Sequence, residues 1–188
     1  MSLQARQAVL DAAVQLLDEQ GWSGFTVDEV ARRSAVSKAT IYKHWSGGLE
    51  VAADAYGEVV THAVPTPATG DVVADLRSQI VRLANFYATP RGAVVVQLLA
   101  AAAEHKGGGN VVRHKFFAPR REASRALIEQ GVANGQLRPD LDPDLTVDVL
   151  FGAMIFRLFN GEKPLKGPAA RKVATTVLRA VVADPSTA

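Results

Sequence analysis

The sequence predicts an all-α protein, and three observations support that fold class. Apolar residues recur three and four positions apart along almost the whole chain, which is the period of a helix with one buried face. Strand-like alternation never extends beyond a few residues. The 188 residues are 48% hydrophobic and 21% charged, so the chain is long and apolar enough to build a globular core.

The N-terminal part of the chain predicts four helices. The first is expected over residues 3–20 and ends before Gly21. The stretches FTVDEVARRSA and SKATIYKHW, at residues 25–35 and 37–45, each hold a helix of barely two turns. Helices this short are marginal alone, so they need tertiary packing. The fourth helix is expected over residues 49–62.

Two prolines and a glycine in PTPATG, residues 65–70, then interrupt the helical pattern. The remaining helices are expected at residues 71–88, 91–104, 110–133, 144–159 and 168–183. Pro119 should disturb the helix that contains it, because a proline donates no backbone hydrogen bond. The fold therefore has about nine helices.

The composition and the N-terminal sequence indicate the cellular compartment in which the protein is expected. The chain has no cysteine, which excludes disulfides and fits a reducing interior. Arg6 and Asp11 interrupt the first apolar stretch, so we expect no signal peptide. No apolar run approaches the roughly 18 residues of a membrane-spanning helix. We therefore expect a soluble, cytoplasmic protein with no membrane partner.

The residues of a catalytic or metal site are missing from the sequence. The four histidines, at positions 44, 62, 105 and 114, form no ligand pair at helical spacing. The loop KGGGN lacks the preceding strand and the following Lys-Ser/Thr of a phosphate-binding loop. No serine lies in a nucleophile elbow. We expect no enzyme activity, no cofactor and no bound metal.

The segment from Val27 onward fits the apolar pattern of a helix-turn-helix. Val30 and Ala31 occupy the fourth and fifth positions counted from Val27, where a small residue lets the two helices approach. Val36 falls at the turn, and Ile41, at the fifteenth position, returns to the inner face. These apolar side chains are expected to fill the angle between the helices and to leave the other residues facing outward.

The ends of the two short helices carry polar groups. Thr26 and Ser37 are expected to cap them, because each hydroxyl accepts an unpaired amide hydrogen of the first turn. Ser37, Lys38 and Thr40 lie at the start of the second helix, the end that enters a major groove in this motif, and are candidate base readers.

The next turn adds Tyr42, Lys43 and His44, whose side chains are expected to donate to flanking phosphates. The alternative is an ordinary helical hairpin with a solvated face and a buried Trp45.

The segment Gly21 to Trp45, G-x-x-x-F-T-V-x-x-V-A-x-x-S-A-V-S-K-A-T-I-Y-K-H-W, resembles the DNA-binding signature of the tetracycline-repressor (TetR) family. That resemblance assigns Thr26 and Val27 to a phosphate-contacting helix start and Trp45 to an aromatic wedge. It assigns to the recognition helix Ser37, Lys38, Ala39, Thr40, Tyr42, Lys43 and His44.

The same resemblance implies the organisation and the function. Residues 1–47 correspond to the helix-turn-helix DNA-binding domain, and residues 48–188 correspond to a helical effector-binding and dimerisation domain. The implied function is a transcriptional repressor that leaves a palindromic operator in double-stranded DNA when a small-molecule effector of unknown identity binds.

Two positions depart from the family pattern. Ala35 stands where a glycine is usual at the turn, and a methyl group disfavours a left-handed backbone by about 1 kcal/mol. Gly48 stands where a lysine usually contacts phosphate. Residues 1–56 also hold five Lys or Arg against seven Asp or Glu, so any affinity for DNA depends on locally placed charge and on dimerisation.

Two C-terminal helices, at residues 144–159 and 168–183, carry more apolar surface than one packing face needs, which favours a four-helix contact in a homodimer over a plain core. The candidate interface residues are Leu150, Phe151, Met154, Ile155, Leu158, Val173, Val177, Leu178 and Val181. The two DNA-binding domains of such a dimer, about 34 Å apart, would then contact one face of DNA.

The effector pocket is expected between the middle helices. Its candidate lining residues are Phe86, Tyr87, Gln97, Phe116, Phe117, Met154 and Arg157. Core packing is the alternative role for these side chains. A basic run from Lys106 to Arg125 fits a solvated face paired with distant carboxylates better than an anion site.

Three functional hypotheses stay open on these residues: a ligand-responsive DNA-binding repressor, a DNA-binding protein without an effector, and a helical interaction protein whose DNA-binding head has decayed.

Overall fold

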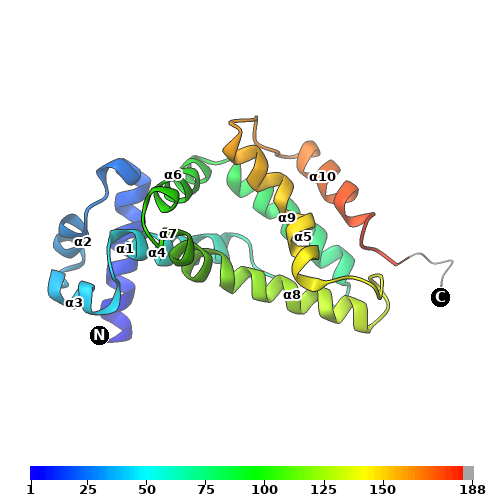
Figure 1. The fold of residues 1–188 in the computed structure, drawn as a ribbon, viewed down its shortest axis with the longest axis horizontal. Helices are drawn as coiled ribbons and strands as arrows, with labels where there is room; N and C mark the ends of the chain where they lie inside the picture. The colour runs from blue at the N-terminus through cyan, green and yellow to red at the C-terminus, as the bar shows by residue number, and fades with distance from the viewer. Residues whose placement is uncertain (184–188) are drawn as a thin grey trace. The chain divides into compact units, whose positions relative to one another are not determined.

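The computed structural model describes residues 1–183 and consists of helices joined by short loops (Figure 1). The α-helices are α1 (Leu3–Gln20), α2 (Val27–Ser34), α3 (Lys38–His44), α4 (Gly48–Ala63), α5 (Val72–Tyr87), α6 (Pro90–Glu104), α7 (Gly108–Val111), α8 (Ala118–Ala133), α9 (Pro143–Phe159) and α10 (Pro168–Leu178). Residues 1–183 contain no strand, only one isolated bridge between Leu137 and Val182. The predicted all-α class is confirmed.

The chain packs as two compact units, which are described separately. One unit comprises residues 1–60 and 90–119, and the other comprises residues 61–89 and 120–183. The predicted domain boundary after residue 47 follows the sequence motif. Packing instead groups α4 up to Val60, α6 and α7 with the N-terminal helices.

The first unit is built around α1, whose apolar face is fully buried. Helices α2 and α6 pack against α1, and α3 packs against α2 (Figure 1). Phe25, which precedes α2, stacks on Trp22 with ring centroids 5.5 Å apart. This packing compensates for the shortness of α2 and α3, which would not be stable in isolation.

The second unit places α5 against α9 and α10, which also pack on each other (Figure 1). Gln79 is buried on α5, and its amide joins two other segments. Its Nε2 donates to Thr66 Oγ1 at 2.8 Å, and its Oε1 accepts from Ser124 Oγ at 3.1 Å. The PTPATG segment that breaks the helical pattern is thus fixed to α5 rather than free.

The predicted helix over residues 110–133 is one continuous run with an irregular start. It begins as α7, passes through a π-helix at Val112–Phe117 and continues as α8. The backbone N–H of Ala118 bonds to Arg113 O, five residues back. The wider π turn immediately precedes Pro119, which lacks an N–H and needs room for its ring against the preceding turn. Counted this way, the described residues form the nine helices that were predicted.

The last helix is shorter than expected. It ends at Leu178, not at residue 183, because the chain beyond it pairs with another segment. Arg138 N donates to Val181 O at 3.0 Å, and Ala183 N donates to Gln136 O at 3.2 Å. These bonds use groups that a continued helix would need for itself.

Within the described residues, no single helix is both long and apolar enough to cross a bilayer. The consecutive helices α5 and α6 meet that criterion only when they are joined across the break between them.

Candidate nucleic-acid interface

The helix-turn-helix is held together by an apolar centre. Val27, Val30 and Ile41 are buried, while Val36 at the turn is half-buried. Their side chains fill the angle between α2 and α3, which is what the sequence pattern predicts. The rest of α3 therefore faces away from this centre.

Ala35 forms the turn with a left-handed backbone, at φ 55° and ψ 22°. Within residues 1–183 it is the only non-glycine residue with positive φ. An alanine in this region is strained by about 1 kcal/mol relative to glycine. The turn therefore keeps the geometry of the motif despite the missing glycine, at a cost in stability.

Both predicted caps are formed. Thr26 Oγ1 accepts from Glu29 N at 3.2 Å, and Ser37 Oγ accepts from Thr40 N at 3.2 Å. Ser37 Oγ also lies 2.9 Å from Thr40 Oγ1, so the two hydroxyls form a hydrogen-bonded pair at the start of α3. The cap positions both side chains at the exposed end of the helix.

The predicted contact residues of α3 are on its outer face. Ser37, Lys38 and Ala39 are exposed, and Thr40, which is hydrogen-bonded to Ser37, is half-buried. The next turn exposes Tyr42, Lys43 and His44. A single short helix thus exposes hydroxyl, ammonium and phenol donors, the types that contact phosphates and base edges, while His44 Nε2 accepts from the terminal ammonium of Met1 at 3.1 Å.

Lys38 is engaged by an acidic neighbour. Its Nζ lies 2.7 Å from Asp28 Oδ1, and the hydrogen bond to Asp28 raises the pKa of Lys38. Both side chains are exposed, so water and salt weaken this pair, and an anionic ligand can displace Asp28. Lys43, by contrast, has no ion-pair partner within residues 1–183.

A hydrogen-bonded lock fixes the end of α3. Trp45 is buried, and its Nε1 donates to Asp54 Oδ2 on α4 at 2.8 Å. The same oxygen accepts from Arg6 Nη2 on α1 at 3.0 Å, while Arg6 Nη1 donates to Glu58 at 2.8 Å. The Trp45–Asp54–Arg6 lock thus joins α1, α3 and α4 through one carboxylate.

A second carboxylate connects α4 with the π-helix. Glu50 Oε2 accepts from the backbone N of Ser46 at 2.8 Å and from its hydroxyl at 2.7 Å. Glu50 Oε1 lies 3.4 Å from Lys115 Nζ. A Cβ added at Gly57 would lie 2.6 Å from Lys115 O, so glycine is needed for the π-helix to approach α4 this closely.

Helix α6 makes one polar contact with α1 and one with the turn that follows α1, and Tyr56 of α4 shares the first of them. Arg91 Nη2 and Tyr56 Oη both donate to the carboxylate of Asp18, each at 2.6 Å. Gln97 Oε1 accepts from the backbone N of Trp22 at 2.7 Å. A movement of α6 would therefore displace Asp18 and Trp22, which precede the helix-turn-helix.

The first turn of α2 carries a charge cluster. Glu29 accepts hydrogen bonds from Arg32 and Arg33, which lower the pKa of its carboxyl to about 2. Arg33 Nη1 also donates to Glu19 on α1 at 2.8 Å. These bonds occupy both arginines, so they hold α2 on α1 and add little free positive charge to the surface.

Gly48 begins α4 beside the apolar centre. A Cβ at this position would meet Phe25 and Val27 atoms at 3.5 Å, which is ordinary van der Waals contact. The backbone and its surroundings therefore accommodate a Cβ here, although the sequence provides none.

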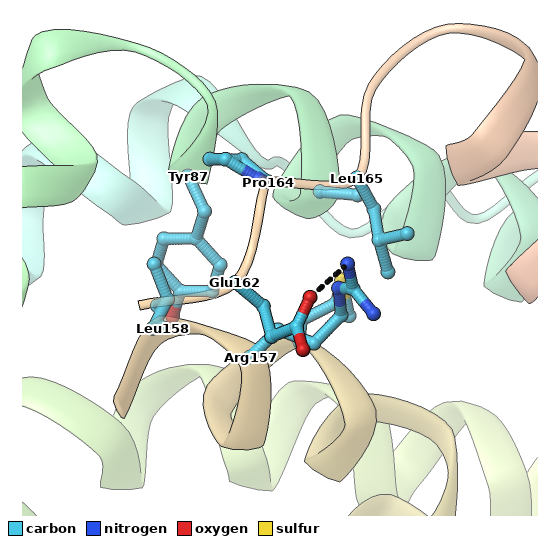
Figure 2. A pocket seen from close by; sticks show the side chains of 8 residues that line it. Tyr87, Arg157, Leu158, Glu162, Pro164 and Leu165 are labelled. Carbon is cyan, nitrogen blue, oxygen red and sulfur yellow. Dashed lines mark hydrogen bonds and ion pairs between the residues drawn. The ribbon is translucent and has the colours of Figure 1, made fainter. Parts of the chain in front are cut away.

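The second unit contains a small cavity, the Tyr87 cavity (Figure 2). It has room for about one water molecule and is lined by Ala84, Tyr87, Met154, Arg157, Leu158, Glu162, Pro164 and Leu165. Figure 2 shows the Tyr87 ring extending from α5 toward Leu158, with the Arg157–Glu162 ion pair beside it at 3.2 Å. Most of the wall is apolar.

Helix α9 exposes an apolar stripe. Leu145, Val149, Phe156 and Phe159 are 65%, 53%, 66% and 58% exposed, respectively. They are spaced by four, seven and three residues, and Gly152 lies within the stripe with open space around it. This spacing places all of them on one helix face, which we call the α9 stripe.

Both halves of the chain match known proteins. Residues 9–47 match the family described as bacterial regulatory proteins, tetR family, and residues 66–177 match the tetracyclin repressor-like C-terminal domain. The HTH-type transcriptional regulator YdeS of Bacillus subtilis, described as uncharacterized, is 34% identical over 96% of this chain and 91% of its own length. This chain belongs to the TetR family of transcriptional regulators.

Other TetR-family proteins agree with that assignment. The crystal structure of the TetR family transcription regulator SCO0332 is 33% identical, with a TM-score of 0.83 over 94% of this chain and 97% of that chain. The DNA-binding transcriptional repressor TetR of Mycobacteroides abscessus is 27% identical over 82% of each chain. TetR-family regulators bind DNA, usually act as dimers and are generally not enzymes. This chain is therefore a DNA-binding transcriptional regulator.

The structure brings together only part of the pocket expected for this TetR regulator. Tyr87, Met154 and Arg157 line the Tyr87 cavity, and Phe86 is buried beside Tyr87 with ring centroids 5.9 Å apart. Three predicted residues belong to the other unit: Gln97, Phe116 and Phe117. Gln97 is used to bind Trp22 N, and the two phenylalanines pack edge to face in the π-helix.

The predicted dimer residues also divide by burial. Four are buried within the protomer: Leu150, Met154, Leu178 and Val181. The other five are half-buried: Phe151, Ile155, Leu158, Val173 and Val177. The residues of the α9 stripe are more exposed than any of these, and the sequence prediction did not include them.

Three of the six basic residues in the run from Lys106 to Arg125 form ion pairs, and burial lowers the pKa of Arg120, which therefore departs from the expected solvated face. Lys115 pairs with Glu50, Arg121 with Asp144 and Asp148, and Arg125 with Glu129.

Proposed function

We propose that this TetR-family regulator is a dimeric repressor that binds a palindromic operator through two copies of α3 and leaves it when a small molecule binds. The outward polar face of α3, fixed by the Trp45–Asp54–Arg6 lock, is the observation that supports this proposal most strongly. A rigid, correctly aimed helix loses little conformational entropy on binding. Such a regulator acts where the genome is, so we propose the cytoplasm as its compartment.

Within this proposal the contacts of α3 divide into two kinds. Lys38 and Thr40, at the amino end, read base edges in the major groove. Tyr42, Lys43 and His44, together with the start of α2 at Thr26 and Val27, contact phosphates. Phosphate contacts position the helix, and base contacts select the sequence.

The charge balance of the head supports a dimer as the binding species. Residues 1–56 hold fewer basic than acidic residues, and Lys38 is already paired with Asp28. One head therefore gains little from phosphate neutralisation. Two linked heads bind with a high effective concentration for the second contact, which raises the overall affinity without new contacts.

The α9 stripe is the surface that we assign to this dimer, together with the half-buried residues of α9 and α10. Exposed phenylalanines on a regular helix face favour pairing with another helix. Gly152 lets the partner backbone approach closely, because no side chain fills the space beside it. A second copy of the same chain supplies a matching apolar stripe across a two-fold axis.

The proposed function is tested by selecting ligands for the purified protein from a random double-stranded DNA library at low salt. The expected result is an inverted repeat whose half-sites lie about one helical turn apart. Enrichment of a single, asymmetric site contradicts the dimer, and enrichment of no sequence at all contradicts DNA recognition by α3. Small molecules are then tested for release of the selected duplex in a gel assay.

A further inference from the structure

An exposed carboxylate lies beside the helix that is proposed to enter the major groove. Asp28 is the second residue of α2, and its side chain is 72% exposed. Phosphates repel such a group, and the adjacent carboxylate of Glu29 is engaged with Arg32 and Arg33. An acidic residue in the first turn is favourable to the helix dipole, which explains a stabilising role within α2 but not a contact with α3.

The contact of Asp28 is made with the residue that starts α3. Asp28 Oδ1 lies 2.7 Å from Lys38 Nζ, and Lys38 is the first residue of α3. The Lys38 side chain is 48% exposed, so its ammonium group is held at the surface by the carboxylate. The hydrogen bond to Asp28, together with the nearby Tyr42, raises the pKa of Lys38, so the group stays an ammonium with three N–H donors.

Two of these three donors remain when one of them bonds to Asp28. Guanine presents two acceptors, O6 and N7, in the major groove, and one lysine can contact both. Lys38 can therefore contact a base while it keeps its bond to Asp28. The ion pair does not have to break when the amino end of α3 enters the groove.

The ion pair changes how bases and phosphates compete for Lys38. Lysine is a flexible side chain that loses rotamer freedom when a contact fixes it. Asp28 already restricts Lys38 in the free protein, so a base contact that keeps the pair has a smaller entropic cost. A phosphate that lies elsewhere is reached only by breaking the pair. Both effects increase the difference in affinity between selected and unrelated DNA.

The other cations of the helix-turn-helix are arranged in the same way. Arg32 and Arg33 bond to Glu29, so they are held by a carboxylate as Lys38 is. Among the lysines and arginines of α2 and α3, Lys43 alone has no ion-pair partner within residues 1–183. A surface with one uncommitted cation attracts DNA of arbitrary sequence only weakly.

We propose that Asp28 is a positioning residue that determines sequence specificity, because its bond to Lys38 directs the ammonium group to a base and withholds it from phosphates. This inference rests on the proposed function, in which Lys38 reads a base edge. It adds a residue that acts through Lys38 and not through DNA. A carboxylate that Lys38 had to leave before binding would instead weaken binding to every sequence alike.

The test compares the unaltered full chain with Asp28→Asn on two duplexes: the selected one, and a scrambled one of the same length and composition. Fluorescence anisotropy at several salt concentrations measures the affinities. We expect Asp28→Asn to bind the scrambled duplex about threefold tighter for each bound domain, the size of an exposed ion pair, and to bind the selected duplex no tighter. The slope of log K against log salt concentration on the scrambled duplex should become steeper by about 0.9 for each bound domain.

A repeated DNA selection locates the effect along the site. With Asp28→Asn, the preference should relax at the base positions that Lys38→Ala changes and at no others. A purely structural role of Asp28 would leave that preference unchanged. Asp28→Glu keeps a carboxylate within reach of Lys38 and should restore the preference.

Two further variants separate the ion pair from net charge. Asp11→Asn removes an exposed carboxylate of α1 that accepts from Gln7 and pairs with no cation in residues 1–183, and it should leave the preference unchanged. In the Lys38→Gln background, Asp28→Asn should change the affinities no more than Asp11→Asn does, because the carboxylate then has no ammonium group to hold.

Three results overturn the role of Asp28. Asp28→Asn could tighten binding to both duplexes by the same factor, which is the behaviour of a simple competitor. It could change neither the affinities nor the preference, or its effect could survive undiminished in the Lys38→Gln background. In each of these results the unaltered protein still selects a sequence, whereas a selection that enriches no sequence is a failure of the proposed function itself.

Discussion

The indole Nε1 of Trp45 donates to Asp54 Oδ2 at 2.8 Å, and this bond ties the end of α3 to α4. Trp45 is buried, and Asp54 is the partner of its N–H. Arg6 shares the same carboxylate oxygen from α1 at 3.0 Å. The orientation of the DNA-binding helix therefore depends on three helices that meet at one carboxylate.

Trp45→Phe tests the lock. The substitution removes the donor to Asp54 and part of the buried ring, so we expect the protein to lose about 1–3 kcal/mol of unfolding free energy. DNA affinity should fall for all sequences alike, because α3 is less firmly oriented while the side chains that would contact DNA are unchanged. Urea unfolding and binding to selected and unrelated duplexes check this. Trp22→Phe is the matched control, since the Trp22 side chain makes no such hydrogen bond. A changed sequence preference in Trp45→Phe contradicts the assignment.

The two kinds of contact on α3 predict two kinds of variant. Lys38→Ala and Thr40→Ala should change which base is preferred, at a cost of about 1–3 kcal/mol of discrimination for each lost base contact. Tyr42→Phe and Lys43→Ala should weaken binding to all sequences. Because Lys43→Ala removes one phosphate contact, the slope of log K against log salt concentration should also become shallower by about 0.9. Repeating the DNA selection with each variant measures this. Four identical preference profiles refute the division.

Gly48→Lys should strengthen DNA binding. The site has room for a Cβ, and an ammonium group carried from the start of α4 is expected to add one phosphate contact. The slope of log K against log salt concentration should become steeper by about 0.9. Gly48→Gln is the matched control, because it adds length without charge. Equal affinities for the lysine variant and the parent protein place Gly48 away from the DNA.

Ala35→Gly should stabilise the protein. Glycine removes the strain of the left-handed turn, and part of that gain is offset by the greater freedom of glycine in the unfolded chain. We expect a net gain of up to about 1 kcal/mol in unfolding free energy, which raises the melting temperature by roughly 2–4 °C. Calorimetry measures the change. A lower melting temperature shows that the turn is not strained.

Acid should destabilise α2 by removing hydrogen bonds within it. Hydrogen bonds from Arg32 and Arg33 hold the pKa of Glu29 at about 2 in the folded protein, below its ordinary value of 4.5. The stabilisation is therefore fully present above pH 4.5 and is lost as the pH falls toward 2. Glu29→Gln should be less stable than the parent protein at pH 7, and the difference should shrink between pH 4.5 and 2. Urea midpoints at several pH values test this, and a constant difference contradicts it.

The helices and the helix-turn-helix could be predicted because their signals are local. Caps at Thr26 and Ser37, the apolar spacing of Val27, Val30 and Ile41, and the stop at Gly21 all act within a few residues. The π turn was not predicted, since it depends on Pro119 and on a distant glycine, Gly57, against which it packs.

The effector site and the dimer surface were only partly predictable, because both depend on which face of a uniformly apolar helix is buried. Helix α9 is apolar almost all round, so the sequence does not distinguish buried Leu150 and Met154 from exposed Val149 and Phe156. Gln97 and Phe116 suited a pocket by residue type. Packing directs Gln97 to Trp22 and leaves Phe116 in the first unit.

The account is tested most directly by the number of protomers on the selected DNA. Native mass measurement of the complex is expected to show two chains on one duplex with two half-sites. A duplex in which the sequence of one half-site is destroyed should lose most of the binding. Phe156→Asp, in the α9 stripe, should give single chains that no longer hold the duplex, while Glu129→Asp should change nothing. A single chain bound tightly and specifically to DNA would contradict the account.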